Sequence, residues 1–92
     1  PANIIDGVAP ERHRRVIDHA LDLLGDHLAL AHAKDRHADG TVAPAGRGTV
    51  DWAHFLSGLS ATGFDGALVA HGMAADDAPA VARFLADQLE RL

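Results

Sequence analysis

Two of the seven histidines, His32 and His71, each lie at the end of a short apolar run of strand length. A neutral imidazole in such a place can hold a divalent metal or pass a proton near pH 7. Because side chains alternate along a strand, each histidine shares a face with the apolar residue two positions before it. We therefore expect two imidazoles to project toward a common site. Two buried histidines bonded to carbonyl oxygens are the alternative.

Two cationic side chains accompany these histidines. Lys34 is the only lysine and follows the first apolar run, so it can hold a substrate oxygen or a phosphate. The alternative is a solvated lysine paired with Asp35. Arg47 stands between Gly46 and Gly48, where backbone N–H groups and a guanidinium can bind an anionic substrate. The same residues are typical of a flexible surface turn, and both interpretations stay open.

The remaining histidines share no spacing typical of a metal site, and no His-x-x-x-His pair falls on a predicted helix. We expect solvated or half-buried side chains at His13, His19, His27, His37 and His54. The sequence also contains no Walker loop, no dinucleotide fingerprint and no Gly-x-Ser-x-Gly elbow. These absences leave the two strand-end histidines as the candidates for chemistry.

Strands and helices that would position these residues alternate along the chain. Residues 1–5 are predicted as the end of an apolar strand, and residues 10–24 as an amphipathic helix that stops at a glycine. Residues 27–34 are the next strand. Residues 35–49 are rich in Gly, Pro and Asp, which predicts a loop.

The same order then repeats. Thr49 is the expected N-cap of a helix that ends at Gly63, and residues 67–71 form the next strand. Asp76 or Asp77 is expected to cap a last helix. The predicted inner face of that helix consists of Val81, Phe84, Leu85 and Leu89.

Strands that alternate with amphipathic helices predict an α/β fold with a parallel sheet. Three consecutive βα units of about thirty residues match the period of an eightfold β/α barrel, which holds about 250 residues. Three units cannot close a barrel and leave two bare sheet edges. With a first residue that is Pro rather than Met, this predicts that residues 1–92 are the C-terminal part of one (β/α)8 TIM-barrel domain. An incomplete open sheet is the alternative.

Composition narrows the function classes. The 92 residues carry 13 acidic and 8 basic side chains, a formal charge of −5, which argues against nucleic-acid binding. No apolar run reaches membrane-spanning length, and no signal-peptide pattern opens the sequence. Since there is no cysteine, disulfide frameworks and thiolate metal sites are excluded, and a cytoplasmic location is expected.

Four segments, in order along the chain, resemble the motifs of one superfamily. Leu28–Asp35 reads Leu-Ala-Leu-Ala-His-Ala-Lys-Asp and is similar to a "His-x-Lys-Asp" strand. Pro44–Trp52 resembles a "Pro-x-Gly-x-Gly-x-x-Asp" loop and helix start, and Leu59–Ala70 a "Leu-x-x-x-Gly-Tyr-Asp-Gly" entry to the final strand. Pro1–Asn3 resembles an "Asp-Pro-x-Asn/His" strand end. The superfamily with these motifs is that of the xylose-isomerase-like TIM barrels, which include sugar-phosphate isomerases and epimerases.

The resemblance implies a divalent metal (Mn, Co, Zn or Mg) at the C-terminal mouth of the barrel, held by two Glu, one Asp and one His. His32 matches the histidine ligand, and the aspartate ligand would immediately precede Pro1. His71 stands where the second glutamate belongs, so it is expected to bind the metal or to act as the catalytic acid or base. The replacement removes a negative charge and favours Mn²⁺, Co²⁺ or Zn²⁺ over Mg²⁺. Asn3 matches a substrate-contacting position.

The predicted function is metal-dependent isomerisation or epimerisation of a sugar or sugar phosphate, by proton transfer next to a carbonyl. One alternative is a non-catalytic or binding relic of the barrel, which the change at His71 favours. Another is a related inosose dehydratase, or a hydrolase similar to the apurinic endonucleases, which the charge of −5 disfavours. The 92-residue chain alone is expected to be inactive and to associate with the remainder of the barrel or with another copy, without nucleic acid or membrane.

Overall fold

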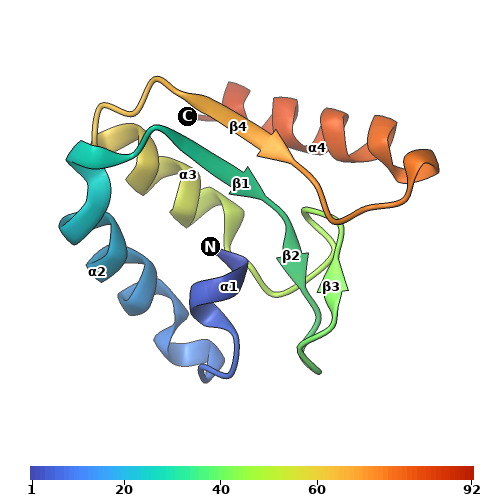
Figure 1. Cartoon of the computed structure of the whole chain (residues 1–92), viewed down its shortest axis with the longest axis horizontal. Helices are drawn as coiled ribbons and strands as arrows, with labels where there is room; N and C mark the ends of the chain where they lie inside the picture. Colours follow the sequence, from blue (N-terminus) through green and yellow to red (C-terminus); the bar gives the residue numbers. More distant parts are fainter.

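The computed structural model describes residues 1–92 of the chain (Figure 1). The four α-helices are α1 (Ala2–Ile5), α2 (His13–Leu24), α3 (Trp52–Ala61) and α4 (Ala78–Glu90). The strands are β1 (Leu30–Ala33), β2 (Asp35–Arg36), β3 (Val42–Ala43) and β4 (Ala67–Ala70). Short 3-10 turns span Pro10–Arg12, Gly25–His27 and Ala75–Asp77.

The strands form two separate two-stranded sheets. β1 and β4 pair in parallel, from Leu30 opposite Ala67 to Ala33 opposite Ala70, and α3 connects them. β2 and β3 pair as a short antiparallel ladder. The predicted mixed α/β class with parallel pairing is therefore confirmed, while the parallel sheet contains two strands rather than three.

One face of the β1–β4 sheet is covered by helices and the other is bare. Ala31 and Ala33 are buried against the helices, whereas Leu30 on β1 is 49% exposed and Val69 on β4 is 41% exposed. This difference follows from the alternation of side chains along a strand. The core between sheet and helices includes Ile17, Phe55, Leu56, Leu59, Val81 and Leu85.

The prediction of a strand at residues 1–5 is wrong, because these residues form the single helical turn α1. The N–H groups of Ile4 and Ile5 both donate to the Pro1 carbonyl oxygen. The turn brings Ala2 and Ile5, which are three positions apart, to one side, where both are buried. Tertiary burial thus outweighs the strand propensity of two adjacent isoleucines.

The helix predicted at residues 10–24 is confirmed, and it passes into a 3-10 turn at Gly25. The N-cap of α3 is Asp51 rather than Thr49, because the Asp51 carboxylate accepts a hydrogen bond from the His54 N–H at 3.1 Å. Asp77 is the N-cap residue of α4, but its side chain makes no capping bond.

Two further predictions are partly met. The segment 35–49, predicted as a loop, contains the β2–β3 ladder. Of the predicted inner face of α4, Val81 and Leu85 are buried, and Phe84 is half-buried, whereas Leu89 is 48% exposed. None of the helices has the length and hydrophobicity needed to cross a lipid bilayer.

Candidate functional site

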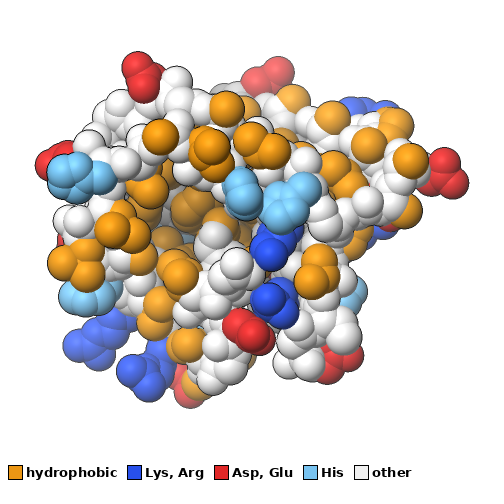
Figure 2. Space-filling model, viewed as in Figure 1, with side chains coloured by type: hydrophobic (Ala, Val, Ile, Leu, Met, Phe, Trp, Pro, Cys, Tyr) orange, Lys and Arg blue, Asp and Glu red, His pale blue; other side chains and the backbone are white.

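His32 and His71 lie side by side at the carboxyl end of the parallel sheet. His32 on β1 pairs with Val69 on β4. Because His71 follows Val69 by two residues, its side chain lies on the same face of the sheet as the side chain of His32. The two ring centroids are 4.5 Å apart, with the ring planes at 77°. Figure 2 shows histidine side chains adjoining each other near the middle of this face. The sequence-based expectation that the two imidazoles meet is therefore confirmed.

The two histidines differ in their surroundings. His32 is exposed, whereas the Nε2 atom of His71 is shielded from solvent and has no hydrogen-bond partner. Burial, followed by the positive charges of His32 and Lys34, lowers the pKa of His71 below its usual value. His71 is thus held as a neutral imidazole, which is the form that binds a metal or accepts a proton.

Lys34 lies near this pair, since its charge acts on His71. Its side chain is half-buried and also runs beside Gly72, the residue after His71. The pairing with Asp35 considered from the sequence is absent, because Lys34 forms no ion pair. The ammonium group therefore has no anionic partner of its own beside the two imidazoles.

Asp35 organises the loop that faces this end of the sheet, a role that the sequence did not reveal. Its carboxylate is fully buried and accepts bonds from the Gly46 N–H at 3.1 Å and the Val50 N–H at 3.0 Å. The Trp52 indole N–H at 2.9 Å and the Arg36 backbone N–H at 2.9 Å complete four donors. These donors satisfy the charge inside the protein, as a buried carboxylate requires.

The glycines of this loop are required by close packing. A Cβ atom at Gly48 would collide with the Asp35 carboxylate and the Arg36 carbonyl, and one at Gly46 would lie 2.8 Å from the Phe84 ring. Gly46 also has a φ of 90°, a backbone conformation that favours glycine. The two glycines thus fit the loop around Asp35 and beneath α4, which is a structural reason for both.

Arg47 does not lie free in this loop. Its guanidinium donates to the Asp77 carboxylate at 2.9 Å, next to the start of α4. Both side chains are partly exposed, so the pair contributes about 0–1 kcal/mol. Binding of an anionic substrate by Arg47 would require this ion pair to open.

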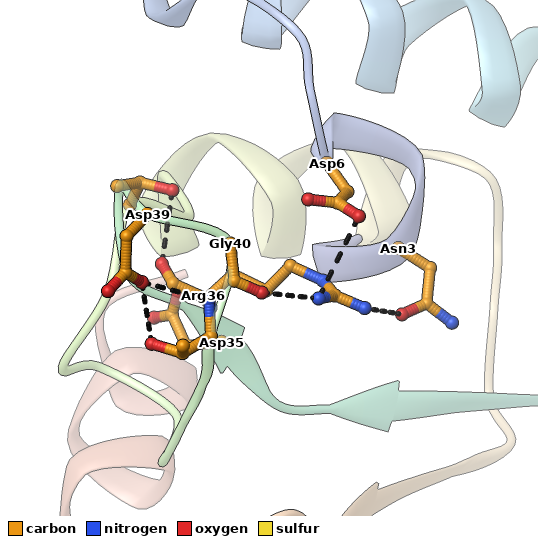
Figure 3. Close-up of polar contacts among 8 residues, drawn as sticks. Asn3, Asp6, Asp35, Arg36, Asp39 and Gly40 are labelled. Atoms are coloured by element: carbon orange, nitrogen blue, oxygen red, sulfur yellow. Dashed lines mark hydrogen bonds and ion pairs between the residues drawn. The ribbon is translucent and has the colours of Figure 1, made fainter.

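Asn3 lies on α1 and takes part in a contact network centred on Arg36 (Figure 3). The Arg36 guanidinium donates to the Asn3 side-chain oxygen at 3.3 Å and to the Gly40 carbonyl at 2.6 Å. It also lies 3.8 Å from the Asp6 carboxylate. The network ties α1 to the β2–β3 hairpin, and the exposed Asn3 side chain keeps its amide nitrogen for other partners.

The histidine pair has no third metal-ligating side chain beside it. No group of three or more His, Cys, Asp or Glu side chains in the chain is placed to hold a metal ion. The two imidazole rings are in direct contact, with centroids 4.5 Å apart, and the Nε2 of His71 is left without a hydrogen-bond partner. The remaining ligands of a metal bound by this pair would come from water, substrate or other protein groups.

Comparisons of this chain with protein-family models, with curated proteins and with solved structures found no match. The resemblance of its motifs to the xylose-isomerase-like barrels therefore stays a prediction. The histidine pair and its neighbours are the basis on which a function can be inferred.

Proposed function

We propose that this chain contributes the metal-binding end of a sugar or sugar-phosphate isomerase or epimerase. The observation that carries the proposal is the histidine pair, with ring centroids 4.5 Å apart, at the carboxyl ends of two adjacent parallel strands. In β/α barrels, the residues that perform catalysis come from this end of the strands. Lys34 adds a cationic group without an anionic partner at the same edge.

The chemistry requires a proton to leave and return at a carbon next to a carbonyl group. A bound divalent metal, Mn²⁺, Co²⁺, Zn²⁺ or Mg²⁺, supplies polarisation of the substrate oxygens. His32 holds the metal. His71, whose pKa is lowered first by burial, binds the metal as a second ligand or accepts the proton from the substrate carbon. Lys34 binds a substrate oxygen or phosphate, and Asn3 and Arg47 are further substrate-contacting candidates.

The proposed architecture is the C-terminal part of a (β/α)8 barrel, with residues 1–92 as part of one domain. The parallel β1–α3–β4–α4 order and the bare, partly apolar sheet face support it, since barrel strands turn that face inward. The proposed partners are the remainder of the barrel or another copy of the chain, and a sugar or sugar phosphate. We place the protein in the cytoplasm, in line with its lack of cysteine.

Metal binding is tested on the 92-residue chain by calorimetric titration with Co²⁺ and Zn²⁺. His32→Ala and His71→Ala should each weaken binding by about tenfold or more. His19→Ala, which changes an exposed histidine on α2, is the matched control and should leave binding unchanged. Binding that survives both substitutions would refute the metal site.

Catalysis is tested in the complete protein that contains this chain, by metal-dependent exchange of substrate C–H hydrogen with solvent deuterium over a panel of ketoses and their phosphates. Exchange that His71→Ala abolishes while metal affinity persists assigns His71 as the base. Loss of both assigns it as a ligand. No exchange with any substrate in the metal-loaded protein would refute isomerase and epimerase chemistry.

A non-catalytic binding module is the second candidate, and the imidazole at position 71 favours it. The resembled family uses a glutamate there, and a neutral imidazole carries no charge to replace it. Under this candidate His71→Glu would leave exchange at zero. Under the isomerase proposal the same substitution supports exchange, with a shift in metal preference toward Mg²⁺ and Mn²⁺.

A further inference from the structure

A polar cavity of about 400 Å³ lies between the segment that follows α1 and the β2–β3 hairpin. Only four of its twelve lining residues are hydrophobic. Residues 5–10 form one wall, and residues of the hairpin, with Arg36 among them, form another. Neither His32, His71 nor Lys34 lines this cavity. A ligand site here would therefore be separate from the histidine pair.

Asp6 and Arg36 bring opposite charges to the lining of this cavity without a hydrogen bond between them (Figure 3). The Oδ2 atom of Asp6 lies 3.8 Å from Nη1 of Arg36, which is beyond the N···O distance of a hydrogen bond. The Asp6 side chain is 48% exposed and that of Arg36 is 21% exposed, so a ligand from solvent can reach both. The two charges are therefore available to a third group.

Arg36 has N–H groups that its contacts within the protein leave over. Its Nη1 atom donates to the Gly40 carbonyl oxygen at 2.6 Å, and its Nη2 atom donates to the Asn3 side-chain oxygen at 3.3 Å. A guanidinium has five N–H donors, two of them on each Nη atom. One N–H on each Nη atom thus remains for a further acceptor, and a carboxylate is the acceptor that guanidinium groups bind best.

The two charges of the cavity select against a simple ion. An anion on Arg36 would lie next to the Asp6 carboxylate, and a cation on Asp6 would lie next to the guanidinium, and like charges so close repel each other. A ligand that carries both charges on neighbouring groups satisfies each side chain and avoids both repulsions. An α-amino acid is such a ligand, because one carbon atom bears its carboxylate and its ammonium group. A polyol carries no charge and gains no ionic attraction to either side chain.

The rest of the lining suits a small apolar side chain. Residues 8–10 and Ala38 add short apolar groups to the wall. His13 is buried, and its Nε2 atom lies 2.8 Å from the Val8 carbonyl oxygen, so that nitrogen is already engaged. His37 lines the cavity as well and is exposed. Since no lysine and no further carboxylate line the cavity, the side chain of the ligand needs no charge.

We propose that the cavity between α1 and the β2–β3 hairpin binds a free α-amino acid with a small apolar side chain. The carboxylate of the ligand accepts hydrogen bonds from Arg36, and its ammonium group donates to the Asp6 carboxylate. The ligand thereby replaces the long contact of 3.8 Å between the two side chains by charge-assisted hydrogen bonds to each. The inference goes beyond the proposed function and does not depend on metal binding or on isomerase chemistry.

Backbone amide chemical shifts measured by NMR test the proposal on the metal-free 92-residue chain. L-Alanine is the probe, propionate is the same molecule without the ammonium group, and ethylamine is the same molecule without the carboxylate. L-Alanine should shift the amide signals of Gly7 and Gly40, which line the cavity, and leave that of Leu68 on β4 unchanged. It should bind at least about tenfold more tightly than propionate or ethylamine.

Three substitutions separate the contributions of the two charges. Asp6→Asn should weaken the binding of L-alanine about tenfold without weakening that of propionate, because only the ammonium group loses its partner. Arg36→Gln should weaken the binding of both. Asp39→Asn, at an exposed carboxylate of the same hairpin that does not line the cavity, is the matched control and should change neither affinity. Circular dichroism verifies the helices of each variant, and Asp6→Asn decides the test if Arg36→Gln does not fold.

Four outcomes would overturn the inference. One is the absence of any shift at Gly7 and Gly40 with L-alanine up to its solubility. Another is propionate binding as tightly as L-alanine, which would identify a site for anions. The third is the same pattern of shifts with sorbitol at equal or higher affinity, which would identify a site for polyols. The fourth is an unchanged affinity for L-alanine in folded Asp6→Asn. Failure of metal binding or of deuterium exchange would refute the proposed function and leave this result unchanged.

Discussion

Single residues at the candidate site are controlled by a few neighbouring charges and donors. The pKa of His71 is lowered by burial and then by the positive charges of His32 and Lys34. Asp35, in contrast, is surrounded by four N–H donors. The His71 side chain therefore lacks a polar partner at Nε2, whereas the Asp35 carboxylate is fully bonded.

The pKa of His71 is predicted to respond to the Lys34 charge. By NMR titration of the imidazole protons, His71 should titrate below the ordinary value of about 6.5. Lys34→Met should raise its pKa toward that value, because it removes a positive charge. Arg83→Met, which changes an exposed cation on α4, should not. An unchanged His71 titration in Lys34→Met would contradict the assignment.

The same shift predicts the direction of a pH effect on stability. Because the folded pKa of His71 is lower than the unfolded one, the unfolded chain binds the proton more readily. The contribution of His71 to the free energy of unfolding is therefore fully present above about pH 6.5. It declines as the pH falls from there toward the pKa of His71 in the folded protein. Urea unfolding of the wild type and of His71→Gln, each at pH 8 and pH 5.5, measures this effect. The free energy of unfolding should fall less on acidification in His71→Gln than in the wild type.

Removal of the Asp35 carboxylate is predicted to destabilise the fold strongly. Asp35→Ala leaves buried N–H groups of Gly46, Val50 and Trp52 without an acceptor, which costs about 3–5 kcal/mol of unfolding free energy. Asp39→Ala, at an exposed carboxylate bonded to Thr41, should destabilise the fold much less than Asp35→Ala does. Chemical unfolding followed by Trp52 fluorescence measures both. Equal effects of the two substitutions would contradict the role of Asp35.

Individual elements are positioned by contacts at their ends. Asp51 joins two helices, since its carboxylate accepts the His54 N–H that begins α3 and also the Arg14 side chain of α2 at 2.8 Å. Partial burial opposes ionisation of Asp51, but the His54 N–H and the Arg14 guanidinium outweigh it and lower its pKa. The start of α3, and the loop that leads to it, are thus fixed relative to α2.

Asp51→Ala is predicted to cost about 0.5–2 kcal/mol of unfolding free energy through loss of the N-cap. Thr49→Ala is the matched comparison and should cost less than about 0.5 kcal/mol, since the Thr49 hydroxyl is exposed. Because the pKa of Asp51 is lowered in the folded protein, its contribution to the free energy of unfolding is present above about pH 4. This contribution is lost as the pH falls through the folded pKa. Urea denaturation near neutral pH and near pH 3 checks both statements.

The elements that the sequence predicted well are those with long apolar stripes. The helix after Pro10 and the helix from Trp52 show clear helical spacing, and the strand before His71 is a short apolar run between turns. Residues 1–5 are too few to show a period of hydrophobic residues. The prediction there rested on the strand propensity of the two isoleucines, and it was wrong. The proximity of His32 and His71 followed from strand alternation and parallel pairing alone.

What the sequence could not provide is contacts between distant positions. Three of the four donors to the Asp35 carboxylate lie 11 to 17 positions later along the chain, and two of these three are backbone groups that no residue type reveals. Thr49 and Asp51 are both good capping residues, and only the backbone path selects Asp51. The ion pair between Arg47 and Asp77 likewise depends on how α4 lies beside the loop.

At the scale of the whole molecule, the most prominent feature is the face of the β1–β4 sheet that no helix covers. Leu30 and Val69 lie on it beside the histidine pair, while the other face is packed against the helices. The molecule is thus a layer of helices on a sheet that lacks a covering on its second side. Contiguous exposed apolar groups next to a free strand edge favour association.

Self-association of the 92-residue chain is predicted to depend on this face. Sedimentation velocity should show species larger than the monomer as concentration rises, and the double substitution Leu30→Thr and Val69→Thr should reduce them. Leu23→Thr is the matched control, because Leu23 is 64% exposed on α2 and lies outside the sheet. A monomer at all concentrations, folded and cooperative, would contradict the prediction.

The anchoring of the loop by Asp35 has a consequence for protein engineering. Three of the four donors to its carboxylate are backbone N–H groups, so the path of the loop depends little on which side chains it carries. Positions 47 and 49 are exposed and can be randomised without disturbing those bonds, provided that Gly46 and Gly48 are kept. The segment is a scaffold on which new ligand specificities can be selected from a library.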